Sequence, residues 1–185
     1  MFAAGSQRAA ATDGASAARV ASSAQVALEG IERGDDVQIN LGRHLLAEAV
    51  SEQSGAAPEQ LETAWLESGL PREVVVYTAL AQVGVMYRAN GEAPGEGFDC
   101  SGLTKYAWSA AGLTLDHNDA TQVANALSVG GAAASALPGD LVQWPGHVML
   151  YLGVDDVVVH AFNSGQPVAV AHVGSHSVVY ADPLG

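Results

Sequence analysis

The sequence predicts an α+β protein in which helices come first along the chain and short strands follow. Up to about residue 127, apolar residues recur at the spacing of amphipathic helices. From Leu141 onward, short apolar runs are separated by Gly, Asp, Asn and Pro, a pattern typical of strands joined by tight turns. Strands that follow one another without intervening helices favour an antiparallel sheet over a βαβ fold.

The composition disfavours several classes of function. The chain has 185 residues, of which 49% are hydrophobic and 15% are charged, so it contains enough apolar material for a core. Its 20 Asp and Glu residues outnumber its 7 Lys and Arg residues, and the net charge is -13. Because this charge repels phosphate groups, we expect binding neither to nucleic acid nor to anionic membranes. No apolar stretch reaches the roughly 18 residues of a membrane span.

The first part of the chain is expected to be helical. Residues 1–15 are rich in Ala, Gly and Ser and predict a disordered lead-in. Residues 16–70 predict a small all-helical segment with three helices, at about 16–33, 36–54 and 58–69. The second of these helices has one apolar face, which consists of Val37, Leu41, Leu45 and Ala49.

Residues 71–185 are expected to form the α+β domain itself. Pro71 can open a helix that ends near Val83, and a Gly- and Pro-rich loop follows over 90–97. Asp99 is a suitable N-cap for a helix that ends at Gly112, and a short helix over 120–127 comes next. The predicted strands are 141–144, 147–152, 157–162, 168–173 and 177–180.

Cys100 is the single cysteine, so the chain has no internal disulfide. It lies in the first turn of the helix that Asp99 is predicted to cap, where backbone N–H groups and the helix dipole stabilise a thiolate. The same N–H groups can serve as an oxyanion hole. A lone cysteine can also be a small buried hydrophobic residue, but the polar neighbours Asp99 and Ser101 disfavour that interpretation. We therefore predict that Cys100 is a nucleophile.

His147 is the best candidate for the base among the six histidines. It opens the predicted strand 147–152, where a side chain can be held rigidly beside a cleft. His160 ends the next strand, and pairing of the two strands through the turn at 153–156 brings the imidazoles together. His160 can then accept the second N–H of His147 and fix its tautomer. Each histidine taken alone is more often structural, and the combination with Cys100 is what predicts a Cys-His-His site.

The other histidines do not indicate a metal site. His172 and His176 are four residues apart, but in a strand-rich stretch this spacing does not place both rings on one helical face. The sequence also lacks an HExxH pattern. We therefore expect no metal and no cofactor. His44, on a predicted helix, and His117, in a predicted loop, are expected to be solvated surface groups.

Five sequence blocks resemble the NlpC family of bacterial cell-wall cysteine peptidases, a circularly rearranged branch of the papain-like fold. In the family's order, the blocks are 82–87, 97–108, 137–142, 146–153 and 159–161. The resemblance covers about residues 72–181, and the run Phe-Asp-Cys-Ser-Gly-Leu from residue 98 to 103 is its most specific part. No single block would be enough by itself.

The resemblance implies a papain-like domain with Cys100 as the nucleophile, His147 as general base and then acid, and His160 as the orienting residue. It also implies three residues that line the substrate site, namely Tyr87, Asp99 and Ser101. Family members typically cleave stem peptides of peptidoglycan, often between D-glutamate and diaminopimelate, and some are amidases, acyltransferases or deamidating toxins. The implied partner is a peptidoglycan stem peptide, and the implied location is secreted or cell-wall associated.

Two segments depart from the family's pattern and leave the substrate open. Where the family usually has Leu-Pro-Arg and a small hydroxyl residue, residues 115–119 read Leu-Asp-His-Asn-Asp, although Gln122 lies where the family has a glutamine. The family's Tyr-x-Trp-Gly-Gly appears over 87–91 without the tryptophan or the first glycine. We therefore weigh three hypotheses: a wall-peptide endopeptidase, a secreted effector that acts on another amide, and a non-catalytic binding module.

The helical segment 16–70 lies outside the resemblance. We expect it to be a packing or oligomerisation appendage, or else an inhibitory or delivery segment that covers the cleft until it is removed. The first eleven residues lack the charged region and long apolar stretch of a secretory signal. Either an export signal was removed or export follows another route, and the sequence leaves the oligomeric state open.

Overall fold

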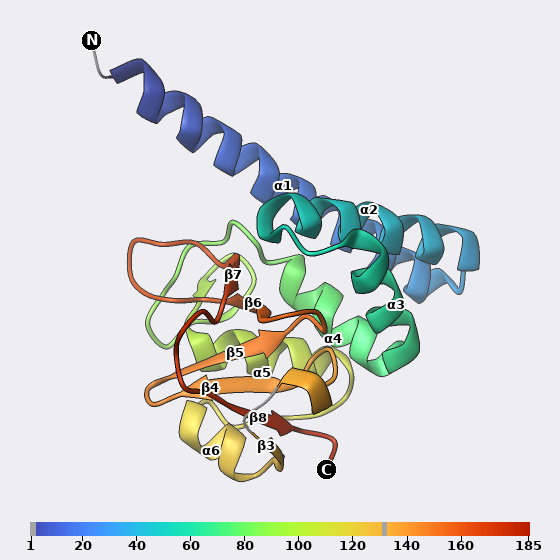
Figure 1. Cartoon of the computed structure of the whole chain (residues 1–185), viewed down its shortest axis with the longest axis vertical. Coiled ribbons are helices and arrows are strands. Elements are labelled where there is room, and N and C mark those ends of the chain that lie inside the picture. The colour runs from blue at the N-terminus through green and yellow to red at the C-terminus, as the bar shows by residue number, and fades with distance from the viewer. Residues whose placement is uncertain (1–2, 131–132) are drawn as a thin grey trace.

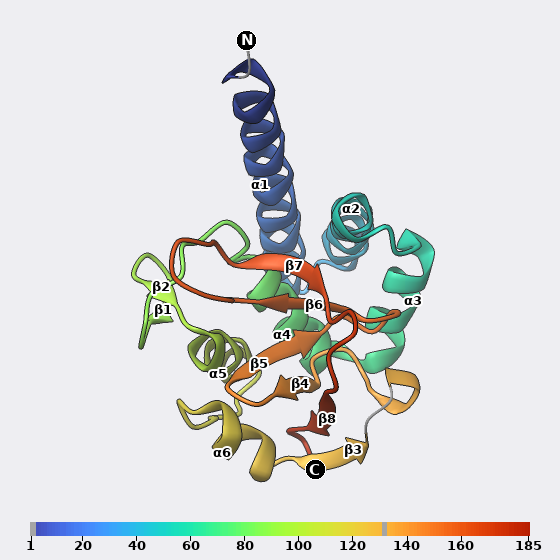
Figure 2. The same ribbon diagram turned by 60° about the vertical axis from the view of Figure 1, so that its left-hand side comes forward.

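The computed structural model describes residues 3–130 and 133–185 (Figure 1). Four helices come first: α1 (Ala3–Arg33), α2 (Asp36–Ser54), α3 (Pro58–Ser68) and α4 (Leu70–Leu80). The N-terminal part of α1 projects away from the rest of the molecule, as Figures 1 and 2 both show. The helix bounds agree closely with the sequence-based expectation from residue 16 onward.

Residues 3–15 differ from that expectation, because they continue α1 where a disordered lead-in was predicted. The segment contains no proline and is rich in alanine, the residue with the highest helix propensity, so nothing in it interrupts the helix. Residues 1 and 2 of the predicted lead-in lie outside the described residues. The division into units at residue 70 stays a prediction, and one buried cluster includes residues from α1, α2, α4 and the sheet.

The α1–α2 hairpin is closely packed, and this packing selects the buried face of α2. A Cβ atom added at Gly42 would lie 2.5 Å from the backbone of Ala27, so only glycine allows the two helices to approach this closely. The face of α2 that includes Gly42 is therefore buried, together with Leu46 and Val50.

The apolar face predicted for α2 is consequently wrong for three of its four residues. Val37, Leu41 and Leu45 are 79%, 52% and 41% exposed, and only Ala49 is buried. The helix does not rotate to bury these larger side chains, because that rotation would move Gly42 away from Ala27, where the two helices are in contact.

Buried polar contacts attach the helices to one another and to the sheet. The Nε atom of Arg43 on α2 donates to Oε1 of Glu73 on α4 at 2.6 Å, and both side chains are buried. The indole N–H of Trp65 on α3 donates to the carbonyl oxygen of Leu152 at 2.8 Å. Since a buried polar group without a partner is costly, these pairings fix the places where the helices dock.

Six of the strands form one antiparallel sheet in the order β3-β8-β4-β5-β6-β7, and β1 and β2 pair separately. Their bounds are β3 (Leu127–Gly130), β4 (Leu141–Trp144), β5 (His147–Tyr151), β6 (Val157–His160), β7 (Ala169–His172) and β8 (Val179–Asp182). This arrangement confirms the α+β class. Within the described ranges, 3–130 and 133–185, no helix is long and apolar enough to cross a membrane.

The strand β3 and the hairpin β1–β2 were not predicted. The helix expected over 120–127 is shorter, because α6 (Asp119–Ala124) ends early and residues 127–130 pair with β8 instead. The short strands β1 (Glu92–Ala93) and β2 (Gly97–Phe98) pair within the predicted loop. In each case the partner strand, which local sequence patterns do not specify, decides the conformation.

Helix α5 (Cys100–Ala110) packs against β5 and so brings its N-terminus to the sheet (Figure 2). Val148 and Leu150 of β5 belong to the same buried cluster as Leu103 of α5. The alternate residues of β5, Met149 and Tyr151, belong to a separate smaller cluster. The alternation of side chains along a strand thus gives β5 two buried faces, and the face toward α5 positions Cys100.

Candidate active site

Cys100 is the first residue of α5 and is half-buried. Asp99 is the N-cap, and its Oδ1 atom accepts the backbone N–H of Gly102 at 2.7 Å. A Cβ atom at Gly102 would lie 2.0 Å from the carbonyl oxygen of Gly91, so glycine is required for the loop to approach the first turn of α5. The structure thus places Cys100 at the helix N-terminus that the sequence predicts.

The protonation of Cys100 differs from the expectation of a stabilised thiolate. Burial is the largest influence and raises the pKa of the thiol, and the nearby charges of Asp99 and Asp119 act in the same direction. The backbone N–H groups of Val148 and Ser101 face the sulfur and lower the pKa, but they do not outweigh burial. The resting group is therefore a thiol, and it needs a base to become a nucleophile.

His147 and His160 lie together, as the pairing of β5 with β6 predicted. The Nε2 atom of His147 is 2.9 Å from the Nδ1 atom of His160. Burial lowers the pKa of both imidazoles to about 4, and for His147 the neighbouring His160 adds to the effect. Both rings are therefore neutral at pH 7, and one must donate the shared hydrogen while the other accepts it.

The sulfur of Cys100 lies at the start of β5, beside the residue that follows His147. The N–H of Val148 that faces the sulfur belongs to the residue directly after His147, so the thiol lies against this end of the strand. Aromatic rings surround the imidazole: the centroid of Trp144 is 4.9 Å and that of Phe162 is 5.4 Å from the centroid of His147. These rings exclude water, which accounts for the low pKa of a side chain that is only 4% exposed.

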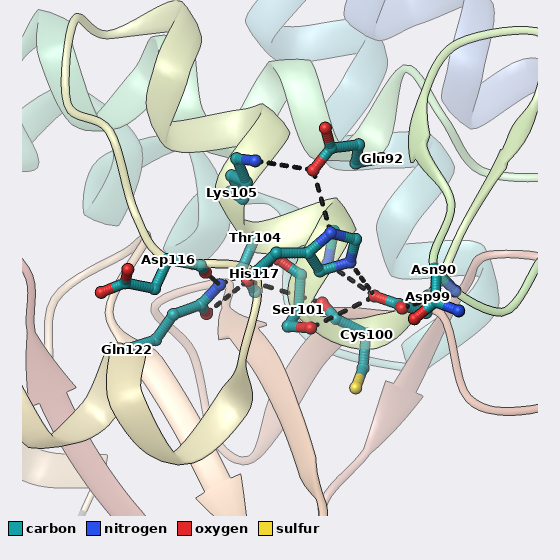
Figure 3. Close-up of polar contacts among 11 residues, drawn as sticks. Asn90, Glu92, Asp99, Cys100, Ser101, Thr104, Lys105, Asp116, His117 and Gln122 are labelled. Atoms are coloured by element: carbon teal, nitrogen blue, oxygen red, sulfur yellow. Dashed lines mark hydrogen bonds and ion pairs between the residues drawn. The ribbon is translucent and has the colours of Figure 1, made fainter.

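The three residues implied to line the substrate site are gathered around Cys100. The Oδ1 atom of Asp99 accepts the hydroxyl of Ser101 at 3.2 Å, and its Oδ2 atom accepts the backbone N–H of Asn90 at 2.9 Å (Figure 3). The backbone of Tyr87 forms an isolated parallel β-bridge with that of Phe98. Burial and the charges of Asp99 and Cys100 raise the pKa of its phenol. Asp99 and Ser101 thus flank Cys100 in the chain, and the phenol of Tyr87 lies near enough for the charges of Asp99 and Cys100 to act on it.

His117 is not the solvated group that the sequence predicts. Its Nε2 atom lies 2.9 Å from Oδ1 of Asp99, and its Nδ1 atom lies 2.9 Å from Oε2 of Glu92 (Figure 3). Glu92 also accepts from Nζ of Lys105 at 2.6 Å. His117 therefore links the hairpin β1–β2 to the residue that precedes Cys100. His44 does lie at the surface, where it contacts Glu62.

Gln122 is a buried part of the site that was not singled out for a role. Its Nε2 atom donates to the carbonyl oxygens of Ser101 at 2.8 Å and Asp116 at 2.6 Å, and its Oε1 atom accepts from the hydroxyl of Thr104 at 2.6 Å. These bonds hold the segment 115–119, which carries His117, against the first turn of α5 (Figure 3).

Possible metal ligands do not converge. Within the part of the chain that the structure describes, no three His, Cys, Asp or Glu side chains are grouped so that they could hold a metal ion. His172 contacts Asp156 and the carbonyl oxygen of Ser54, whereas His176 stacks on Trp144 with 4.3 Å between centroids. These two histidines therefore have separate packing roles.

A comparison with protein families matches residues 84–180, just over half of the chain, to the NlpC/P60 family. The chain belongs to the NlpC/P60 family. A probable endopeptidase of Mycobacterium tuberculosis is 39% identical over 119 residues, which cover 61% of this chain. The chain spans only 29% of that relative's length.

Solved NlpC/P60 structures have the same fold as this chain. The peptidoglycan hydrolase RipB of Mycobacterium tuberculosis superimposes with a TM-score of 0.52 and 26% identity, covering 65% of this chain and 67% of RipB. RipD of the same organism, described as a non-catalytic domain adapted to peptidoglycan binding, gives a TM-score of 0.52 and 27% identity, covering 61% of this chain and 97% of RipD. The family thus includes both hydrolases and binding proteins.

The NlpC/P60 pattern contains the signal by which His117 could have been found. The family usually has Leu-Pro-Arg where this chain has Leu115, Asp116 and His117, so both have a residue of basic type at the third position. A basic residue at this place suggests an acidic partner. The identity of the partners, Asp99 and Glu92, depends on the fold.

Proposed function

We propose that this chain is a peptidoglycan endopeptidase that hydrolyses stem-peptide amide bonds, most specifically D-glutamyl-diaminopimelate bonds, with Cys100, His147 and His160. The observation that carries the proposal is the pair of neutral imidazoles, whose facing nitrogens are 2.9 Å apart, at the start of β5 where the thiol lies. A thiol whose pKa is raised needs an unprotonated base beside it to become a nucleophile. Membership of the NlpC/P60 family and the likeness to a peptidoglycan hydrolase support the same substrate class.

The proposed first step is attack of the sulfur on the amide carbon. With the hydrogen between the imidazoles on Nε2 of His147, Nδ1 of His160 accepts it, and Nδ1 of His147 is left free to take the proton of the thiol. The sulfur forms a bond to the carbonyl carbon as this proton leaves. The backbone N–H of Cys100, at the first position of α5, is suited to stabilise the oxygen that becomes negative.

The remaining steps return the groups to their starting state. The imidazolium of His147 gives its proton to the leaving amine as the carbon–nitrogen bond breaks, and a thioester remains on Cys100. Water then attacks the thioester and loses a proton to His147, and that proton returns to the sulfur when the acid is released. In this scheme His160 does not react. It holds the ring of His147 in one tautomer and orientation.

The proposed location follows from the proposed substrate. Peptidoglycan lies outside the cytoplasmic membrane, so a chain with this activity must be secreted or wall-associated. The net charge of -13 is compatible with a soluble enzyme that reaches its substrate by specific contacts and not by attraction to anionic polymers.

The decisive experiment incubates the protein with purified peptidoglycan and with defined muropeptides, and identifies the products by mass spectrometry. Wild type should release fragments cut at one type of stem-peptide bond, and Cys100→Ala should release none while keeping its circular dichroism spectrum and melting temperature. Digestion by Cys100→Ala at the wild-type rate would show that the nucleophile is another group. The fragment masses also identify the scissile bond.

A non-catalytic binding module is the second candidate, and the likeness to RipD favours it. Alkylation by iodoacetamide separates the two functions, since a thiol with a nearby base reacts at neutral pH faster than an isolated buried thiol. Wild type that binds muropeptides without cleaving them, and whose Cys100 reacts slowly, would support the binding module. A reactive Cys100 without activity on any muropeptide would favour an amide substrate outside the wall.

A further inference from the structure

His117 lies between two carboxylates in the wall of the candidate site. Each of its two ring nitrogens is 2.9 Å from a carboxylate oxygen, one on Asp99 and the other on Glu92. The side chain is 23% exposed, so it is part of the wall and does not extend into solvent. Figure 3 shows the ring between the hairpin that carries Glu92 and the first turn of α5.

We propose that His117, as an imidazolium, is the positioning residue of this site: it holds the hairpin β1–β2 against the N-terminus of α5 and offsets the negative charge of Asp99 beside Cys100. The consequences of this role for catalysis rest on the proposed function. The effect of His117 on the Cys100 thiol does not rest on it, because that effect requires no substrate.

The two contacts fit a doubly protonated ring. The Nε2 atom forms a hydrogen bond with Asp99, and the Nδ1 atom lies at ion-pair distance from Glu92. A carboxylate oxygen accepts hydrogen bonds and cannot donate them when ionised, so a neutral imidazole would turn one bare nitrogen toward a carboxylate.

A positive charge on His117 partly offsets the acidic groups around it. Two carboxylates, Glu92 and Asp99, face Lys105 and His117. Asp116 and Asp119 add negative charge nearby, because their partners Asn125 and Gln143 are neutral amides. A neutral side chain in place of the imidazolium therefore leaves more negative charge between the hairpin and α5.

That negative charge would act on Cys100 in two ways. Asp99 precedes Cys100 and already raises the pKa of its thiol, so loss of the compensating cation raises it further. The hairpin would also be held less firmly. The carbonyl oxygen of Gly91, the residue before β1, accepts the backbone N–H of Asp99 at 2.9 Å and lies against Gly102, so movement of the hairpin disturbs the first turn of α5.

The test compares His117→Gln, which keeps hydrogen-bonding groups but has no charge, with His117→Arg, which carries a permanent charge. His44→Gln is the matched control, because His44 also contacts a carboxylate but lies at the surface of α2. The first readout is the rate of Cys100 alkylation by iodoacetamide from pH 5 to pH 10. At pH 7, His117→Gln should react roughly threefold more slowly than wild type, because the pKa of the thiol rises further. His117→Arg should react within about twofold of wild type, and His44→Gln should match it.

The second readout is the split between KM and kcat for a muropeptide at pH 7. His117→Arg, which keeps a charge, should have a KM close to that of wild type. His117→Gln should have a higher KM, with a smaller change in kcat. A residue that merely filled space would not separate the arginine and glutamine variants in this way.

Equal alkylation profiles for wild type and His117→Gln would overturn the proposal, as would equal behaviour of His117→Gln and His117→Arg. Melting temperatures show whether each variant is folded. If His117→Gln does not fold, Glu92→Gln removes the same link from the hairpin side. Its alkylation profile is then compared with those of wild type and His117→Arg. If wild type cleaves no muropeptide, the proposed function fails. The alkylation rates of Cys100 still test the role of His117, because they need no substrate.

Discussion

The Nε2 atom of His147 lies 2.9 Å from the Nδ1 atom of His160, which joins the start of β5 to the end of β6. The partner of the candidate base is therefore another neutral imidazole and not a carboxylate. A neutral partner orients the ring of His147 but does not stabilise a positive charge on it as an aspartate would.

Removal of this partner should lower activity without removing the nucleophile. In His160→Ala, His147 loses its orienting contact, and kcat should fall by roughly a hundredfold or more. His160→Asn keeps an oxygen acceptor and should retain more activity than the alanine variant. Both are measured as release of muropeptide fragments. Cys100 alkylation that stayed at the wild-type rate, together with unchanged kcat, would contradict the role given to His160.

Acid should destabilise the protein through the same two rings. Burial lowers the pKa of His147 and of His160 from the ordinary 6.5 to about 4, so between these values the unfolded chain binds more protons than the folded chain. Their contribution to stability is complete above pH 6.5 and is lost as the pH falls toward about 4. Melting temperatures at pH 7, 5.5 and 4.5 check this. His160→Asn, which has one such ring fewer, should lose less over the same interval.

The buried Arg72 should contribute strongly to stability. It forms ion pairs with Asp140 at 2.7 Å and with Asp182 at 2.6 Å, and so connects α4 to the sheet. Arg72→Ala leaves these carboxylates without a cation, and the free energy of unfolding should fall by about 3–5 kcal/mol. Arg88→Ala, which breaks the exposed pair with Glu96, is the control and should cost less than about 1 kcal/mol. Urea denaturation curves that give equal losses would refute the assignment.

The hairpin of α1 and α2 should not tolerate a side chain at Gly42. Gly42→Ala places a methyl group 2.5 Å from the backbone of Ala27, and the strain should cost about 1–3 kcal/mol. Gly14→Ala tests the opposite case in α1, because no atom lies within 4 Å of the added Cβ. That substitution should leave stability unchanged or raise it by roughly 0.5–1 kcal/mol through helix propensity. Thermal unfolding of the two variants distinguishes these outcomes.

What the sequence determines by itself is the local structure around the candidate site. Asp99 as an N-cap, Cys100 in the first turn of a helix, and the strands that begin at His147 and end at His160 all follow from patterns a few residues long. The meeting of the two histidines followed as well, because a tight turn between adjacent strands leaves little choice of pairing.

Tertiary structure alone decided the features that depend on distant residues. His117 reaches Glu92 and Asp99, β3 pairs with β8, and α2 turns its glycine, not its leucines, toward α1. The protonation of the Cys100 thiol also depends on distant residues. Its helix N-terminus favours a thiolate, but its pKa is raised because burial and the surrounding charges, which local sequence does not reveal, have the larger effect.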